Sequence, residues 1–233
     1  MKDKALVIYA RPPVEGAVKT RLQPHFSAEE ALILYDAMLA DLLERAARAA
    51  AGEATLFVSW SSAYDPQGEM IGLLKGYEVE YQVGDDLGER MATTLQARLR
   101  GGFKQAVLIG SDSPHLPLDY VHQAFEALLA VDVVLGPCPD GGYYLIGCRR
   151  LHPRLFQRMP WGTDQVLSIT RRRIKDGGVL HHELPPWYDV DAPADVLRLW
   201  KDLQHMKSKG SADLPSRTFR ALAALVPGRA GLR

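Results

Sequence analysis

The sequence predicts an α/β fold with a mostly parallel central sheet. Short apolar runs rich in β-branched residues alternate with segments in which apolar residues recur every three or four positions. Polar stretches rich in glycine and proline follow several of these runs, and ligands of open α/β sheets bind where strands end. We expect one domain over residues 1–206, followed by a basic, loosely packed tail over residues 207–233.

Composition narrows the class of protein. The 28 basic and 28 acidic residues give a formal net charge of +0, which argues against nucleic acid or an anionic membrane as the main partner. No apolar run is long enough to span a bilayer, and the chain begins without a cleavable apolar leader. Cys138 and Cys148 lack the spacing of a metal site. We therefore expect a cytoplasmic protein with reduced cysteines.

The first expected strand spans residues 5–10 and leads into an irregular loop over residues 11–21. Two prolines and Gly16 exclude regular structure there. Gly16 also allows backbone N–H groups to approach a ligand closely, as phosphate-binding loops require. The loop has neither the Walker pattern nor G-x-G-x-x-G. Its position after a strand favours anion binding over a solvated basic loop, and its polar side chains for that role are Arg11, Lys19, Thr20 and Arg21.

Capping boxes begin two of the expected helices. Ser27 with Glu30 begins the first, which Gly52 ends. Asp86 with Glu89 begins the second. Both helices carry apolar residues on one face, so we expect them to cover the sheet.

Two more strands are expected at residues 55–60 and 77–83, and the alternation of polar and apolar residues in the second indicates a place nearer an edge. Gly88 then falls in the first turn of the following helix, where glycine costs stability. It indicates a close approach by backbone or ligand, and we include Gly88 among the candidate phosphate-binding residues.

The stretch AVLIGSDSPHLP, residues 106–117, is the most informative part of the chain. Its first four residues have the pattern of a strand buried on both faces, and the chain must turn directly afterwards. Asp112 therefore sits at the carboxyl end of a strand, where a carboxylate can hold a divalent cation that binds phosphate oxygens. The alternative is that Asp112 only caps a turn or the helix expected from about Asp119.

Strands are also expected at residues 132–137 and 143–146, with a hairpin turn or a close backbone approach at residues 140–142. A helix ended by Gly177 and a strand at residues 179–184 follow. Near the end of the expected domain, Asp189 and Asp191 alternate on one face of an extended segment, so two carboxylates converge. Ordinary helix-start chemistry is the alternative for Asp191, because a helix follows it directly.

Five motifs carry a resemblance to a known family. They are R-P-P-x-x-G-x-x-K-T-R, G-S-D-S-P, G-P-x-x-D-G-G-Y-Y, P-W-G-T and W-Y-D-V-D-A-P-A-D, and together they cover about residues 4–200. The chain resembles a bacterial glycosyltransferase-like family of the nucleotide-diphospho-sugar transferase superfamily. Its first loop is also similar to that of 2-phospholactate and phosphoenolpyruvate guanylyltransferases.

The resemblance implies a three-layer α/β/α GT-A fold and a nucleotide or nucleotide-sugar donor on the first loop. It implies Arg11, Gly16, Lys19 and Arg21 at the phosphates, and Mg²⁺ or Mn²⁺ on Asp112 and Asp191. Lys19, Arg21 and Asp112 are then the catalytic candidates. The usual D-x-D motif reads Ser-Asp-Ser here, and a single aspartate suits nucleotidyltransferases as well as glycosyltransferases.

The acceptor or sugar side is expected where other loops follow the sheet strands. Its candidates are Asp140, Gly141, Gly142, Tyr143, Trp161 and Thr163. For Tyr143 and Trp161 the alternative is a place in the core, as for any single aromatic residue.

Three functions stay open. The first is metal-dependent glycosyl transfer from a nucleotide-activated donor to a small-molecule acceptor. The second is nucleotidyl transfer to a phosphorylated small molecule with release of pyrophosphate, which the three cations of the first loop favour. The third is a non-catalytic nucleotide-binding protein. A Rossmann dehydrogenase is disfavoured because its glycine fingerprint is missing. A homodimer stays open as well.

Overall fold

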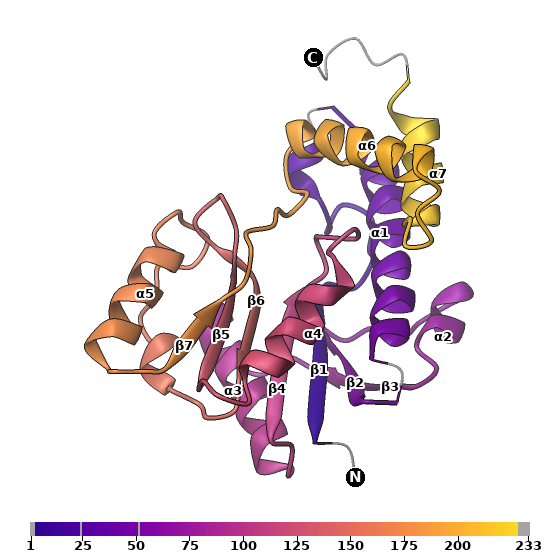
Figure 1. Cartoon of the computed structure of the whole chain (residues 1–233). Coiled ribbons are helices and arrows are strands. Elements are labelled where there is room, and N and C mark those ends of the chain that lie inside the picture. The colour runs from indigo at the N-terminus through magenta and orange to yellow at the C-terminus, as the bar shows by residue number, and fades with distance from the viewer. Residues whose placement is uncertain (1–2, 24, 51, 228–233) are drawn as a thin grey trace.

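The computed structural model describes residues 3–23, 25–50 and 52–227, and within them seven strands form one sheet (Figure 1). The strands are β1 (Lys4–Ala10), β2 (Ala54–Trp60), β3 (Tyr77–Tyr81), β4 (Gln105–Gly110), β5 (Val133–Pro137), β6 (Tyr143–Cys148) and β7 (His181–Glu183). Their order is β3-β2-β1-β4-β6-β5-β7. Only β6 runs antiparallel to its neighbours, β4 and β5. The expected mostly parallel sheet is confirmed, and β3 lies at an edge as its alternation predicts.

The described helices are α1 (Ala28–Ala49), α2 (Glu69–Leu73), α3 (Leu87–Arg100), α4 (Leu118–Ala127), α5 (Val166–Asp176), α6 (Pro193–Ser208) and α7 (Ser216–Leu225), with 3-10 turns η1 (Thr20–Leu22) and η2 (Pro153–Leu155). The capping box of α1 is confirmed, because Glu30 N donates to Ser27 Oγ at 3.1 Å and Ser27 N donates to Glu30 Oε2 at 2.8 Å. In the described part of the chain, no helix has both the length and the apolar character to cross a bilayer.

The inner strands β1, β4, β5 and β6 are covered on both faces, which explains why they are mostly apolar. Successive side chains of β1 enter opposite cores: Leu6 and Ile8 pack with α1 and α4, whereas Ala5 and Val7 pack with α3 and α5. This period of two follows from the pleat of a strand. The three layers are therefore helix, sheet and helix.

A third apolar cluster lies on the side of α1 away from the sheet. Leu34 and Met38 of α1 pack there with Leu199 of α6 and Leu222 of α7, and all four side chains are buried. Figure 1 shows α6 and α7 together beside α1. The expectation of a loosely packed tail from residue 207 is therefore wrong for α7, because the apolar face of α7 is covered by α1 and α6. Residues 228–233 lie outside the described residues.

An extended segment, residues 184–191, carries the chain from β7 to α6 and passes the carboxyl ends of β5 and β4 (Figure 1). Three backbone hydrogen bonds fix its path. Leu184 N donates to Leu135 O at 2.8 Å, Trp187 N to Pro137 O at 3.0 Å, and Val190 N to Asp112 O at 3.0 Å. This crossing segment therefore brings the end of the domain onto the loop that follows β4.

Candidate active site at the carboxyl edge of the sheet

The candidate site is assembled from three segments that are far apart in the sequence. They are the loop after β1 (residues 11–21), the loop after β4 (residues 111–117) and the crossing segment. All three lie at the edge where the parallel strands end, because β1 pairs in parallel with β4. This is the edge at which α/β folds bind ligands.

Lys19 lies at the centre of the site. Its Nζ contacts Asp112 Oδ1, donates to Val190 O at 2.7 Å and lies 3.2 Å from Asp191 Oδ1. The Lys19 side chain is only 3% exposed, so the ammonium group is almost fully enclosed by these three oxygens. Burial lowers the pKa of Lys19, but the charges of Asp112 and Asp191 outweigh it and raise that pKa above its ordinary value. The ammonium group therefore stays charged between two carboxylates.

The backbone at Lys19 is unusual. Its φ of 48° and ψ of 37° lie in the left-handed region, which non-glycine residues adopt rarely. Such a conformation costs on the order of 1 kcal/mol and persists only where its surroundings enforce it. Here it precedes the 3-10 turn η1 and directs the side chain to Asp112 and Asp191. The strained backbone of Lys19 thus places its ammonium group between Asp112 and Asp191.

The other predicted phosphate-binding residues surround Lys19 on the surface. Arg11, Gly16, Thr20 and Arg21 are all exposed. The Arg21 side chain is 72% exposed, and its Nη1 lies 3.7 Å from Asp191 Oδ2. Gly16 has a φ of +76°, and nothing lies within 4 Å of the place where a Cβ would stand. The loop therefore presents two exposed guanidinium groups and an open backbone around one buried ammonium group.

A buried hydroxyl group joins two of the three segments. Tyr35 Oη accepts from Arg11 N at 3.1 Å and lies 3.0 Å from Arg11 O and 3.1 Å from Ser111 Oγ. Burial raises the pKa of Tyr35 to about 12, so the group stays protonated and can donate. The sequence indicates Tyr35 only as one apolar position of a helix, because no local signal reveals hydrogen bonds to residues this distant.

The structure also decides between two readings of Asp191. A carboxylate before a helix often caps it, yet α6 is capped by Asp195, whose Oδ2 accepts from Ala192 N at 2.8 Å and from Asp191 N at 3.2 Å. The Asp191 side chain is thereby left for Lys19 and Arg21. Helix-start chemistry accounts for Asp195, not for Asp191.

Asp189 belongs to the same cluster but faces different partners. Its Oδ1 lies 2.8 Å from Ser113 Oγ, and Cys138 Sγ lies 3.7 Å from its Oδ2. Burial, and then the charge of Asp112, raise the pKa of Asp189 to about 7. The two-residue spacing predicts that Asp189 and Asp191 converge. It does not indicate that Asp189 contacts Ser113 whereas Asp191 contacts Lys19.

Asp112 and Asp191 fit a divalent cation. Carboxylate oxygens are ligands that Mg²⁺ and Mn²⁺ prefer, and these two side chains are 37% and 42% exposed and already share one cation, Lys19. Among the described residues, no group of three or more His, Cys, Asp or Glu side chains could hold a metal ion. Two carboxylates suit Mg²⁺ that takes its remaining ligands from substrate phosphates and water.

Gly88 has a different role from the predicted one. It is buried, and a Cβ at this position would stand 2.4 Å from Phe156 O and 2.5 Å from a ring carbon of Trp161. The close approach is therefore made by the protein itself. Packing requires this glycine, and the buried position does not support contact with phosphate.

The predicted acceptor residues divide into a turn and a packed pair. Gly142 N donates to Asp140 Oδ1 at 2.9 Å in the turn between β5 and β6, as the hairpin prediction requires. The rings of Tyr143 and Trp161 meet edge to face, with centroids 6.3 Å apart, in the core beneath α3 and α5. Both rings thus pack against the core, which is the alternative to a role in binding the acceptor. Thr163 is exposed, and its Oγ1 donates to Pro160 O at 2.8 Å.

His115, just beyond Asp112, gives the protein a predictable response to acid. Its ring packs between Trp187 and Tyr188, and neither ring nitrogen has a hydrogen-bond partner among the described residues. Burial, with the charges of Arg45 and Arg198, lowers the pKa of His115 to about 3. In the unfolded chain, His115 becomes protonated near pH 6.5, whereas in the folded protein it stays neutral until about pH 3. The free energy of unfolding therefore falls as the pH drops from 6.5 towards 3.

We expect this group to cost about 2 kcal/mol of stability at pH 5 relative to pH 7.5. His115→Phe keeps the ring and removes the titration, so the difference in unfolding free energy between wild type and variant should grow by that amount between the two pH values. Urea denaturation at both pH values measures it. Parallel curves for the two proteins would contradict the assignment.

Comparison of the chain with known proteins identifies the family to which it belongs. The model of the family described as "Uncharacterized protein conserved in bacteria (DUF2064)" matches residues 42–163. No curated protein matches the chain. The crystal structure of a "putative nucleotide-diphospho-sugar transferase" from Desulfovibrio desulfuricans G20 is 30% identical, with a TM-score of 0.85 over 96% of this chain and 95% of that chain.

Two more distant structures share the fold. A CMP:2-keto-3-deoxy-manno-octonic acid synthetase complexed with CTP is 16% identical, with a TM-score of 0.54 over 88% of this chain and 100% of that chain. A 4-diphosphocytidyl-2C-methyl-D-erythritol synthase from Anaerococcus prevotii is 12% identical, with a TM-score of 0.57 over 87% of this chain and 96% of that chain. Such likenesses show the fold alone. With the closer structure, they confirm the expected three-layer fold of nucleotide-diphospho-sugar transferases.

Proposed function

This chain belongs to the bacterial family DUF2064, and from that premise we propose that it is a metal-dependent transferase that moves a group from a nucleotide-activated donor to a small acceptor. One observation carries the proposal. The ammonium group of Lys19 is held between Asp112 and Asp191 at the carboxyl edge, beside an exposed loop with two further cations. The 30% identical relative described as a nucleotide-diphospho-sugar transferase supports it.

The loop after β1 is suited to the donor phosphates. Arg11 and Arg21 are exposed there, so their guanidinium groups can make bidentate hydrogen bonds to phosphate oxygens. Lys19 adds a fixed positive charge beneath them. Fixed charges that need no rearrangement stabilise the negative charge that develops on a leaving phosphate. No protein nucleophile is required, because an oxygen of the acceptor attacks directly.

Asp112 and Asp191 would hold Mg²⁺ or Mn²⁺. When bound, the ion supplies positive charge that neutralises the phosphate oxygens of the leaving group. Tyr35 serves the same site indirectly, since its hydroxyl group holds the loop of Arg11 against Ser111, the neighbour of Asp112.

Two reactions fit this site, and a separate observation favours each. In nucleotidyl transfer, an acceptor oxygen bonds to the α-phosphorus of a nucleoside triphosphate and pyrophosphate leaves. The three cations of the first loop favour this reaction, because a triphosphate offers them more negative charge. In glycosyl transfer, the acceptor oxygen bonds to the anomeric carbon and a nucleoside diphosphate leaves. The description of the Desulfovibrio relative favours this second reaction.

Thermal unfolding with a ligand panel tests the proposal and separates the reactions. Nucleoside triphosphates, nucleoside diphosphates and nucleotide-diphospho-sugars are each added with Mg²⁺ or Mn²⁺ and with EDTA. A ligand at a hundred times its dissociation constant adds about 2.7 kcal/mol of stability, or about 5–11 °C in midpoint for a chain of this size. We expect one class of donor to give this shift only with metal. A triphosphate would indicate nucleotidyl transfer, and a nucleotide-sugar would indicate glycosyl transfer.

Asp112→Asn is the test variant, since it keeps the size of the side chain and removes its charge. Asp119→Asn is a matched control on the exposed start of α4. The shift should be lost in the first variant and kept in the second. No shift with any nucleotide, or an equal shift in Asp112→Asn, would overturn the proposal.

A further inference from the structure

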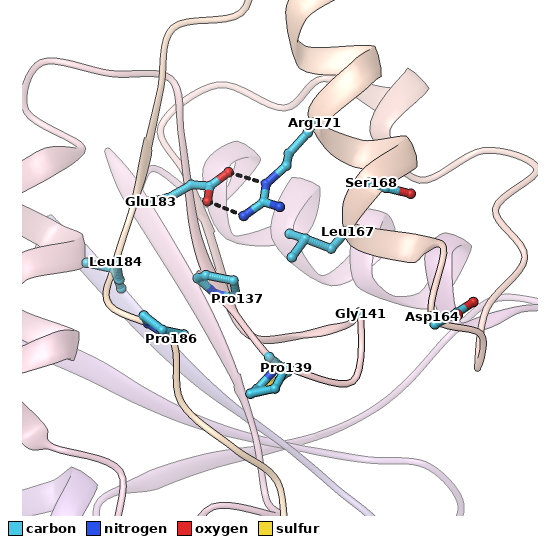
Figure 2. Close-up of a pocket in the computed structure, with 11 residues that line it drawn as sticks. Pro137, Pro139, Gly141, Asp164, Leu167, Ser168, Arg171, Glu183, Leu184 and Pro186 are labelled. Carbon is cyan, nitrogen blue, oxygen red and sulfur yellow. Dashed lines mark hydrogen bonds and ion pairs between the residues drawn. The ribbon is translucent and has the colours of Figure 1, made fainter.

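A pocket of about 450 Å³ lies between the end of β5, the first turns of α5 and β7 (Figure 2). It contains Gly141 of the predicted acceptor turn in its wall. The residues that determine its chemistry are Pro137, Pro139, Leu167, Ser168, Arg171 and Glu183. This pocket is separate from the loop that carries Lys19, but it opens at the same edge of the sheet, because β5 and β4 both run antiparallel to β6 and so end together.

A single residue connects the pocket with the carboxylate cluster. Cys138 lines the pocket, and its Sγ lies 3.7 Å from Asp189 Oδ2. Asp189 in turn lies 2.8 Å from Ser113 Oγ, and Ser113 follows Asp112 in the chain. Cys138 therefore separates a molecule in the pocket from Asp189, and Asp189 contacts Ser113, the residue next to Asp112.

The walls of the pocket are mostly apolar and rigid. Pro137, Pro139 and Pro186 surround it with three pyrrolidine rings, and Leu167 and Leu184 complete the apolar surface (Figure 2). Proline has few conformations to lose, so these walls hold their shape when a ligand binds. They suit the C–H face of a compact ring.

The polar wall is an ion pair. Arg171 Nε and Nη2 donate to Glu183 Oε1 and Oε2 at 2.8 and 2.7 Å, and the third guanidinium nitrogen is turned away from Glu183 (Figure 2). Among the described residues that line the pocket, Arg171 is the one cation, Glu183 balances its charge, and the exposed Asp164 adds a second carboxylate. A phosphate group entering here would meet a carboxylate as closely as a guanidinium group. Hydroxyl groups, by contrast, can accept from Nη1 and donate to Glu183.

We propose that this pocket binds the acceptor, and that the acceptor is an uncharged ring with several hydroxyl groups, such as a sugar or a cyclitol. The role as acceptor rests on the proposed function, whereas the preference for a neutral polyhydroxylated ring rests on the pocket alone. The resemblance of the first loop to guanylyltransferases implies a phosphorylated acceptor. The ion pair between Arg171 and Glu183 disfavours such an acceptor in this pocket.

Saturation-transfer NMR tests this preference without nucleotide or metal. The probes are D-glucose, D-mannose and myo-inositol, each beside its monophosphate. We expect at least one neutral probe to bind, with its monophosphate about tenfold weaker. Ser168→Trp places an indole in the pocket from an exposed position and should abolish binding. Arg172→Trp, on the next and also exposed residue of α5, is the matched control and should leave binding unchanged.

Glu183→Gln supplies a second test, because it removes the balancing charge and leaves Arg171 free. We expect the preference to shift by about tenfold towards the monophosphates in this variant. The proposal is overturned if no neutral probe binds the wild-type protein, or if a neutral probe still binds Ser168→Trp. It is also overturned if the wild-type protein binds the monophosphates as tightly as the neutral probes. Because no donor is present, these outcomes are independent of the nucleotide panel, and either proposal can fail alone.

Discussion

Replacing Lys19 by methionine should reduce the rate of transfer by about 100- to 1,000-fold, the usual effect of removing one fixed charge from a site that stabilises a developing anion. Methionine keeps most of the length of the side chain, and Asp112 and Asp191 are exposed enough to be hydrated, so the variant should fold. Steady-state kinetics with the donor identified by thermal unfolding measures the loss. Lys19→Arg retains the charge and should recover part of the rate.

A second measurement separates catalysis from structure in this variant. The ammonium group of Lys19 binds the same carboxylate oxygens that we assign to the metal, and it repels a second cation. Without it, Mn²⁺ alone should bind about tenfold more tightly, as titration calorimetry can show. Slower transfer with tighter metal binding would support Lys19 as a catalytic charge. Weaker metal binding in Lys19→Met would instead indicate that Lys19 only maintains the shape of the site.

The strands could be predicted because burial on both faces leaves a strong local signal. Mostly apolar runs mark β1, β2, β4 and β5, and each expected range agrees with the structure within one or two residues. The order of the strands could not be predicted, since nothing in the run of β6 indicates that it lies between β4 and β5. Pairing is decided by contacts between distant segments, and the sequence pattern within one strand does not contain them.

The site could be predicted in part for the same reason. Lys19 and Asp112 stand in loops directly after buried strands, and the fold brings such loops to one edge. Tyr35 and Ser113 were not predicted to take part, because their partners are 24 to 76 residues away. Gly88 shows the opposite error, in which a local rule correctly indicates a close approach but cannot identify what approaches.

Replacing Asp41 by alanine should destabilise the protein by about 3 kcal/mol and lower its melting midpoint by about 6–12 °C. Asp41 belongs to α1 and is 3% exposed. Its two carboxylate oxygens accept from Arg217 N at 3.2 Å and from Thr218 N at 2.7 Å, so the side chain caps α7 from a different helix. Alanine would leave these N–H groups buried without an acceptor, which costs more than the loss of an exposed cap.

Glu69→Gln provides the control for this prediction, because Glu69 also pairs with Arg217 but is 66% exposed. An exposed ion pair contributes less than about 1 kcal/mol, so this variant should melt close to wild type. Differential scanning calorimetry of both variants therefore decides how the tail is held. If Asp41→Ala also melted like wild type, this polar contact would contribute little to stability, and the apolar face of α7 alone would hold the tail. A large loss confined to Asp41→Ala would mean that a polar contact spanning 177 residues fixes the tail, which no local pattern could have indicated.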